Sequence, residues 1–124
     1  ALPAAIGGKL AAPDKPVVAL VGDGGFQFTL QELGTAVEQR LPIAILLWNN
    51  DSLAMIRDGM VERGIPEIGV NQHNPDFQAL ANAYGCHAVR PSNLADIEQA
   101  LKEAFSRDRP TLIEVREDAA YLTD

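Results

Sequence analysis

The sequence contains a single cysteine, Cys86, and this scarcity excludes several kinds of protein. One thiol cannot form a disulfide within the chain, and it cannot supply a cysteine-rich zinc site. Basic residues are also in the minority, so the chain has a formal net charge of −7. Because a nucleic-acid or anionic-membrane surface needs a basic patch, we expect neither nucleic acid nor membrane as a partner. We expect Cys86 itself to be a small buried side chain.

Long apolar runs and targeting signals are missing as well. No apolar run reaches the ~18 residues that suggest a transmembrane helix, and no segment reads as a signal peptide. The expected location is therefore the cytoplasm. A G-x-G-x-x-G fingerprint is also lacking, which argues against a dinucleotide-binding domain.

The composition nevertheless supports a real core. Apolar residues make up 47% of the 124 residues, enough for one domain and too little chain for two. The sequence opens on ALPAAIGGKL, a helix-like segment without a leading methionine or a capping residue. We interpret residues 1–124 as a single domain that was cut from a longer protein.

Short apolar runs alternate with stretches of helical periodicity along the whole chain. The runs at 17–21 and 43–48 are continuously apolar, which is typical of parallel strands buried on both faces. Further strands are predicted at 86–90 and 111–115, and helices at 2–10, from Thr29, at 50–64, 74–85 and 92–105. This order predicts an α/β fold, a three-layer sandwich with a mostly parallel sheet and helices on both faces.

Several polar residues read as helix caps. Thr29 and Glu32 have the spacing of a capping box. Asn50 or Asp51 is expected to cap the third helix, and Asn74 followed by proline is expected to begin the fourth.

Polar residues end both of the first two apolar runs. The first run ends in Gly22-Asp23-Gly24-Gly25 and the second in Asn49-Asn50-Asp51. A right-handed crossover brings the carboxyl ends of neighbouring parallel strands to the same edge of a sheet, where ligands bind in such folds. Oxygen atoms of Asp23 and Asn50 suit a hard cation such as Mg²⁺, whose shell is usually completed by water and by phosphates. The pattern therefore predicts a metal-bridged diphosphate site, with backbone N–H groups of the glycines facing the phosphates.

The spacing of the two motifs supports this interpretation. Between Gly24 and Asn49 lie 24 residues. The pattern GDG, 24 residues, NN resembles the signature of the thiamine-diphosphate-dependent enzymes. The segments ALPAAIGGKL, VVALVGDGGFQFTLQEL and LPIAILLWNND resemble the acetolactate synthase and 2-oxo acid decarboxylase branch of that family, in its C-terminal cofactor-binding domain.

The resemblance implies a ligand for each polar position. Thiamine diphosphate and Mg²⁺ are the expected cofactors, with Asp23, Asn50 and the backbone carbonyl of Ser52 on the metal. Residues expected to hold or contact thiamine diphosphate are Gly22, Asp23, Gly24, Gly25, Asn50, Ser52, Leu53, Ala54 and Met55. The N–H groups of Gly24, Gly25, Leu53 and Ala54 would bind the diphosphate. Met55 is expected either to face the substrate or to be a core residue, whereas Asn49 is expected to shape the turn.

The resemblance also implies what this chain does not supply. In the family, a glutamate from a pyrimidine-binding domain of a neighbouring subunit activates the cofactor, so no catalytic residue is assigned here. The chain alone is expected to be inactive, and the full enzyme to be a homo-oligomer that decarboxylates a 2-oxo acid with or without C–C bond formation. Three alternatives stay open: an acetolactate-synthase-like enzyme, a decarboxylase of a larger 2-oxo acid such as 5-guanidino-2-oxopentanoate, and a non-catalytic diphosphate-binding module.

Overall fold

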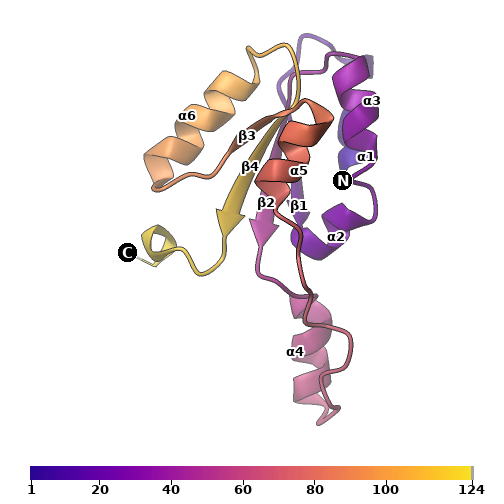
Figure 1. Cartoon of the computed structure of the whole chain (residues 1–124), viewed down its shortest axis with the longest axis vertical. Helices are drawn as coiled ribbons and strands as arrows, with labels where there is room; N and C mark the ends of the chain where they lie inside the picture. The colour runs from indigo at the N-terminus through magenta and orange to yellow at the C-terminus, as the bar shows by residue number, and fades with distance from the viewer. Residues whose placement is uncertain (124) are drawn as a thin grey trace.

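The computed structural model describes residues 1–123 and contains one parallel sheet (Figure 1). Its four strands lie in the order β1-β2-β4-β3, and every neighbouring pair is parallel. The strands are β1 (Val17–Gly22), β2 (Ile43–Asn49), β3 (His87–Val89) and β4 (Thr111–Arg116). All four predicted strands are present, within one or two residues of their expected ends.

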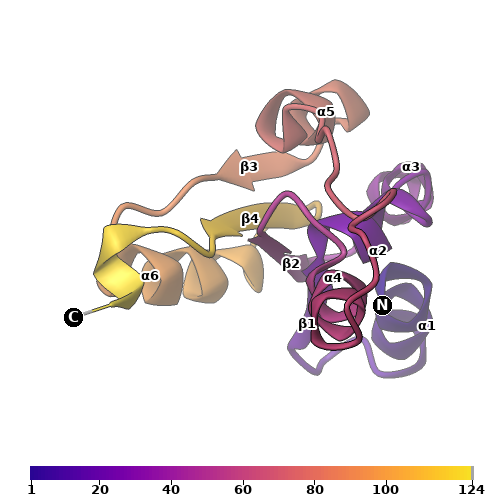
Figure 2. The same cartoon turned by 90° about the horizontal axis from the view of Figure 1, so that it is seen from below.

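Helices cover both faces of this sheet, which confirms the predicted α/β sandwich (Figure 2). On one face pack α1 (Leu2–Ala11), α3 (Glu32–Glu38) and α5 (Phe77–Tyr84), and on the other packs α6 (Leu94–Ala104). The alternation of side chains along β2 explains the two layers, because Ile45 faces the first set of helices and Ala44 faces α6.

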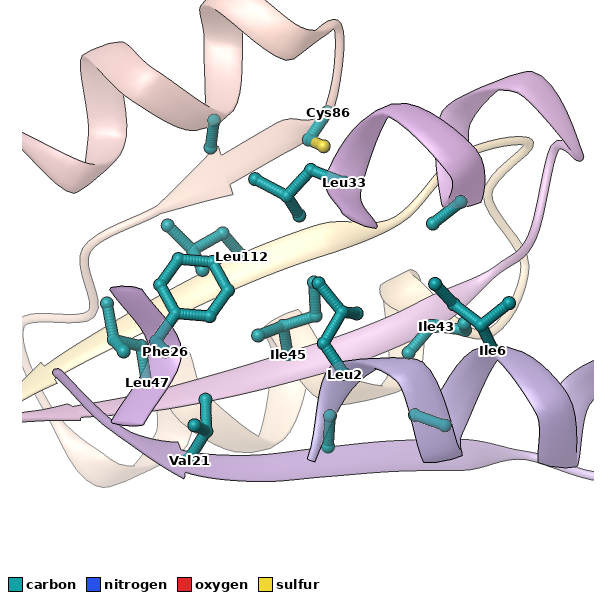
Figure 3. Packing of buried hydrophobic residues seen from close by; sticks show 14 of the residues in the cluster. Leu2, Ile6, Val21, Phe26, Leu33, Ile43, Ile45, Leu47, Cys86 and Leu112 are labelled. Carbon is teal, nitrogen blue, oxygen red and sulfur yellow. The ribbon is translucent and has the colours of Figure 1, made fainter. Parts of the chain in front are cut away.

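The larger core lies between the sheet and α1, α3 and α5 (Figure 3). Phe26 and Phe77 meet edge to face, with ring centroids 5.9 Å apart, and both are fully buried. Cys86 lies in the same core, as predicted. Burial raises the pKa of its thiol to about 11, against a smaller opposing effect of Arg109, so the residue acts as a hydrophobic side chain.

The prediction that β1 is buried on both faces is wrong. Ala19 and Val21 point into the core, but Val18 and Leu20 point away from it, and Leu20 is 66% exposed. The reason is that β1 is an edge strand and α6 packs on β2 and β4. The second face of β1 therefore stays open at its carboxyl end.

A short helix follows β1 where the sequence predicted a turn. Residues of the glycine-rich motif form the first turn of α2 (Asp23–Gln27), which the buried ring of Phe26 fixes to the core. The predicted capping box is also wrong, because α3 begins after Gln31 without a side-chain cap and Glu32 accepts instead from Thr35. In α2, the packing of Phe26 into the core has outweighed the poor helix propensity of Gly24 and Gly25.

The third predicted helix forms but buries none of its residues. In Figure 1, α4 (Ala54–Glu62) and the returning loop project beyond the carboxyl ends of the strands. Leu53, not Asn50 or Asp51, occupies its N-cap position, and no side chain caps it. An antiparallel bridge between Ser52 and Asn71 joins the two sides of this projection at its base.

The N-cap predicted for α5 is wrong, whereas the one predicted for α6 is confirmed. The side chain of Asp76, not of Asn74, caps α5 by accepting from the N–H groups of Gln78 and Ala79 at 2.9 and 3.0 Å. Asn93 caps α6 as expected. Near the C-terminus a 3₁₀ turn, η1, spans Ala120–Leu122. None of the helices in residues 1–123 combines the length and the apolar character that a membrane span requires.

We predict that Asp76→Ala lowers the free energy of unfolding by about 1 kcal/mol, the usual cost of losing a helix N-cap. Chemical denaturation followed by circular dichroism measures this change. Asp14→Ala, in the exposed turn before β1, is the control and is expected to change little. Equal stability of the two variants would contradict the capping role of Asp76.

Candidate functional site

The parallel register of β1 and β2 brings the two predicted motifs together. Gly22 pairs with Trp48, so Asp23 lies beside the Asn49-Asn50-Asp51 turn at the carboxyl edge of the sheet. Asp23 is only 2% exposed. One residue joins the two motifs directly: Asn74 Nδ2 donates to Asp23 Oδ2 at 2.6 Å and to Oδ1 of Asn49 and of Asp51, both at 3.0 Å.

Sequence reasoning missed this role of Asn74. The Asn-Pro pair has the local pattern of a helix start, and the contacts it makes lie up to 51 residues away. The orientation of its amide is fixed from the other side, because Gln27 Nε2 donates to Asn74 Oδ1 at 2.9 Å. A flipped amide would place an oxygen against three oxygens, so the structure admits one orientation only.

Asn49 shapes the turn, as predicted, and a buried carboxylate holds it there. Asn49 Nδ2 donates to Glu114 Oε1 at 2.8 Å, and both residues are 3% exposed. Gln78 and Arg90 donate to the other carboxylate oxygen at 3.1 and 2.8 Å. Burial opposes the ionisation of Glu114, but the hydrogen bonds from Arg90, Asn49 and Gln78 outweigh it and hold the pKa of Glu114 below its ordinary value.

Three further hydrogen bonds fix the rest of the turn. Asp51 has a φ of 54°, a left-handed conformation that is uncommon outside glycine. Arg116 NH1 donates to Asp51 Oδ2 at 2.7 Å, and the N–H of Gln72 donates to the carbonyl of Asp51 at 2.9 Å. Asn50 Oδ1 accepts from the N–H of Ser52 at 3.2 Å. Neither Glu114 nor Arg116 carried a local sequence signal for this role.

A cavity of about 750 Å³ opens at this edge, over the uncovered face of β1 and beside the start of α4. Asp23, Asn50 and Ser52, the three expected metal ligands, all line it. All nine residues predicted to bind the cofactor are among its lining residues, together with Leu20, Val21, Leu46, Trp48 and Ile56. The structure thus places the predicted residues in one cavity; their ligand roles stay predictions.

The backbone donors differ from the prediction at one position. Gly24 and Gly25 are in the first turn of α2, where a helix leaves its own N–H groups unpaired. The N–H of Leu53, in contrast, donates to the carbonyl of Val70 at 2.8 Å and is not free for a phosphate. The N–H groups of Ala54 and Met55 begin α4 and have no backbone acceptor within residues 1–123. Leu53 therefore lines the cavity without a free N–H group for the diphosphate.

Met55 is not a core residue, which settles one of the two alternatives for it. Its side chain is 92% exposed at the mouth of the cavity. An apolar side chain in that place is available to a substrate or to another part of the protein.

Two features of the site bear on what it can hold. Gly24 is closely packed by neighbouring side chains, since a Cβ there would lie 2.6 Å from Leu53 Cδ2 and 2.8 Å from Gln72 Oε1 and would have to displace them. Ser52 Oγ and Gln72 Oε1 are buried at this site without a hydrogen-bond partner in residues 1–123. Buried polar atoms without partners are rare, and a bound ligand is one explanation for them.

We predict that Glu114→Gln lowers the free energy of unfolding by about 2 kcal/mol at pH 7, since hydrogen bonds to a charged group are lost. The folded-state pKa of Glu114 lies below the unfolded value, so its contribution is present above about pH 4.3 and is lost as the pH falls further. Urea denaturation between pH 3 and 7 should therefore show a shallower acid loss in the variant. Glu38→Gln, on the exposed side of α3, is the control. If the free energy of unfolding depended on pH equally in Glu114→Gln and in the original protein, the stabilising role of the Glu114 carboxylate would be contradicted.

Comparison with known proteins shows the family of the chain. Residues 1–115 match the family model described as thiamine pyrophosphate enzyme, C-terminal TPP binding domain. The chain is 49% identical over 120 residues to a protein of Pseudomonas aeruginosa named Probable 2-ketoarginine decarboxylase AruI, covering 96% of this chain and 22% of that protein. It is 40% identical over 114 residues to a Methanococcus aeolicus protein named Probable acetolactate synthase large subunit, covering 90% and 19%.

A solved structure shows the same fold. The thiamine diphosphate-dependent 4-hydroxybenzoylformate decarboxylase of Rhodococcus jostii RHA1 superimposes with a TM-score of 0.85 at 34% identity, covering 93% of this chain and 22% of that one. The chain thus spans about a fifth of the length of these relatives. With its sheet edge, its glycine-rich first turn and the matched family model, the chain belongs to the thiamine pyrophosphate enzymes, as their C-terminal cofactor-binding domain.

Proposed function

We propose that this chain binds the diphosphate of thiamine diphosphate through Mg²⁺, as one domain of a longer enzyme that decarboxylates a 2-oxo acid. The observation that carries the proposal is the convergence of Asp23, Asn50 and Ser52 on one cavity at the ends of β1 and β2. The coverage of only a fifth of each relative supports the view that further domains complete the enzyme.

The donor set suits magnesium. Asp23 offers a carboxylate oxygen, Oδ1, that accepts no hydrogen bond within residues 1–123, while Oδ2 is held by Asn74. Asn50 adds an amide oxygen and Ser52 a backbone carbonyl. Hard oxygen donors that fill only part of an octahedral shell are typical of Mg²⁺ sites completed by phosphate and water. The cation would also balance the charge of a carboxylate that is almost fully buried.

The backbone would hold the rest of the diphosphate. Gly24 and Gly25 lie in the first turn of α2, and Ala54 and Met55 in that of α4, so two helix N-termini line one cavity. Unpaired N–H groups at helix N-termini attract anionic oxygens. In this proposal the N–H of Met55 replaces that of Leu53, which is already bonded.

Thiamine diphosphate, when bound, supplies the electron sink for decarboxylation of a 2-oxo acid. The residues of this chain would bind and orient it. The apolar wall of the cavity, with Leu20, Leu46 and Ile56, would exclude water around the non-phosphate part. A glutamate on a pyrimidine-binding domain of a neighbouring subunit in a homo-oligomer would complete the site.

Of the two enzymatic alternatives, decarboxylation of 5-guanidino-2-oxopentanoate has the stronger support. The relative named as a 2-ketoarginine decarboxylase is 49% identical to this chain, and acetolactate synthase large subunits of Methanococcus aeolicus, Escherichia coli and Lactococcus lactis are 37–43% identical. Acetolactate synthesis from pyruvate stays the second candidate.

We predict that thiamine diphosphate binds this protein only when Mg²⁺ is present, as measured by isothermal titration calorimetry with Mg²⁺ or with a chelator. Asp23→Ala and Asn50→Ala should each weaken cofactor binding by roughly 10–100-fold, since even residues that only support a metal ligand have effects of this size. Asp14→Ala is the control with unchanged affinity. Binding that is indifferent to the metal would show that Asp23 and Asn50 do not have the proposed role.

The activity is tested in the longer enzyme with a panel of 2-oxo acids, by following CO₂ release and identifying the products. We expect the highest kcat/KM for 5-guanidino-2-oxopentanoate with release of the aldehyde. Formation of acetolactate from pyruvate as the main reaction would favour the second candidate. Absence of turnover with every acid, in a protein that binds the cofactor, would instead support a non-catalytic diphosphate-binding module.

A further inference from the structure

We infer that Asn74 is a positioning residue for the cation site: its amide holds the Asp23 carboxylate against the Asn49–Asp51 turn and leaves Asp23 Oδ1 for the cation. The inference rests on the proposed Mg²⁺ site and adds to it a residue that is not itself a metal ligand. The contact that carries it is the 2.6 Å hydrogen bond from Asn74 Nδ2 to Asp23 Oδ2.

The position of Asn74 follows from the path of the chain before it. The segment 70–74 runs along the turn after β2: Val70 accepts from the N–H of Leu53, Asn71 bridges to Ser52, and the N–H of Gln72 donates to Asp51. Asn74 is the next residue whose side chain reaches the turn. It ends this segment between the ends of β1 and β2, and Gln27 of α2 fixes its amide.

The charges around Asn74 explain why an amide nitrogen stands there. Oxygens of Asp23, Asn49 and Asp51 all lie within 3.0 Å of Nδ2. An amide group has two hydrogens, so three acceptors exceed what it can satisfy at once. Arg116 neutralises Asp51 at 2.7 Å, but within residues 1–123 the only side chain that donates to the buried carboxylate of Asp23 is the neutral amide.

The buried carboxylate of Asp23 lacks a positively charged partner in residues 1–123, and a cation would supply one. A buried carboxylate with a single neutral donor is costly unless a positive charge is near. A cation on Asp23 Oδ1 would supply that charge, while Asn74 keeps the other oxygen and so sets the direction in which Oδ1 points. Mutation of a side chain that hydrogen-bonds to a metal ligand in this way typically weakens the affinity for the metal by about 10–100-fold.

The test compares Asn74→Ala, Asn74→Asp and the control Asn71→Ala, all in the same full chain. Asn71 lies in the same loop, and its exposed side chain donates to Glu67 and not to the cluster around Asp23. Mn²⁺ binding in the presence of thiamine diphosphate is followed by electron paramagnetic resonance, well below each melting temperature. We expect Asn74→Ala to bind Mn²⁺ about 10-fold more weakly than the original protein, and Asn71→Ala to bind it equally well.

Asn74→Asp separates a positioning role from a purely structural one. The new carboxylate would face those of Asp23 and Asp51, so the melting temperature in chelator should fall below that of the original protein. Added Mg²⁺ offsets this repulsion, so the rise in melting temperature on adding Mg²⁺ and cofactor should be larger than in the original protein. In Asn74→Ala the same rise should be smaller. A purely structural role would lower the melting temperatures of both variants and leave the two rises alike.

The outcomes distinguish the two levels of the proposal. If Asn74→Ala binds Mn²⁺ as tightly as the original protein while Asp23→Ala does not bind it, the role of Asn74 is overturned and the cation site stands. If the original protein binds neither Mn²⁺ nor thiamine diphosphate, the cation site itself is overturned and the role of Asn74 with it.

Discussion

The parallel pairing of β1 with β2 is the constraint on which the rest of this structure depends. The register that sets Val17 beside Ile43 also sets Gly22 beside Trp48, so the residues after both strands meet at one edge. A shift of β2 by one residue would turn Asn49 to the opposite face of the sheet. The pairing of β1 with β2 therefore fixes the cavity as well as the core, because buried side chains such as Ile45 hold the register.

In the polar cluster at that edge, two carboxylates have a positively charged donor and one does not. Glu114 has three donors, one of them a guanidinium, and Asp51 is paired with Arg116. Buried ionised groups are tolerated when they are paired and hydrogen-bonded in this way. Asp23 has a neutral donor only, and Ser52 Oγ and Gln72 Oε1 have none within residues 1–123. Asp23 and Ser52 line the cavity, whereas a third buried atom without a partner in residues 1–123, Thr111 Oγ1, lies at the start of β4, away from it.

The open surfaces of the chain are consistent with a domain that works with others. The second face of β1 exposes Val18 and Leu20. Helix α4, which projects beyond the ends of the strands (Figure 1), exposes Met55 and Ile56 at the cavity and Val61 beyond it. Apolar surface of this kind marks contact with other protein or with ligand in many proteins. The relatives, about five times as long, have ample chain to cover it.

The sequence by itself determined the strands, the order of strand and helix, the edge of the sheet and the two motifs, since each is encoded in runs of neighbouring residues. The two motifs and their flanking segments resemble the family that the family model then showed. Only the tertiary structure decided that residues of GDGG begin a helix, that Asp76 caps α5, and that Asn74, Glu114 and Arg116 hold the site. The contacts through which Asn74, Glu114 and Arg116 hold the site join residues 23 to 65 positions apart. Local patterns carry no information on such pairs, because the same Asn-Pro that can start a helix can also be drawn away from it by a better hydrogen bond that only the folded chain provides.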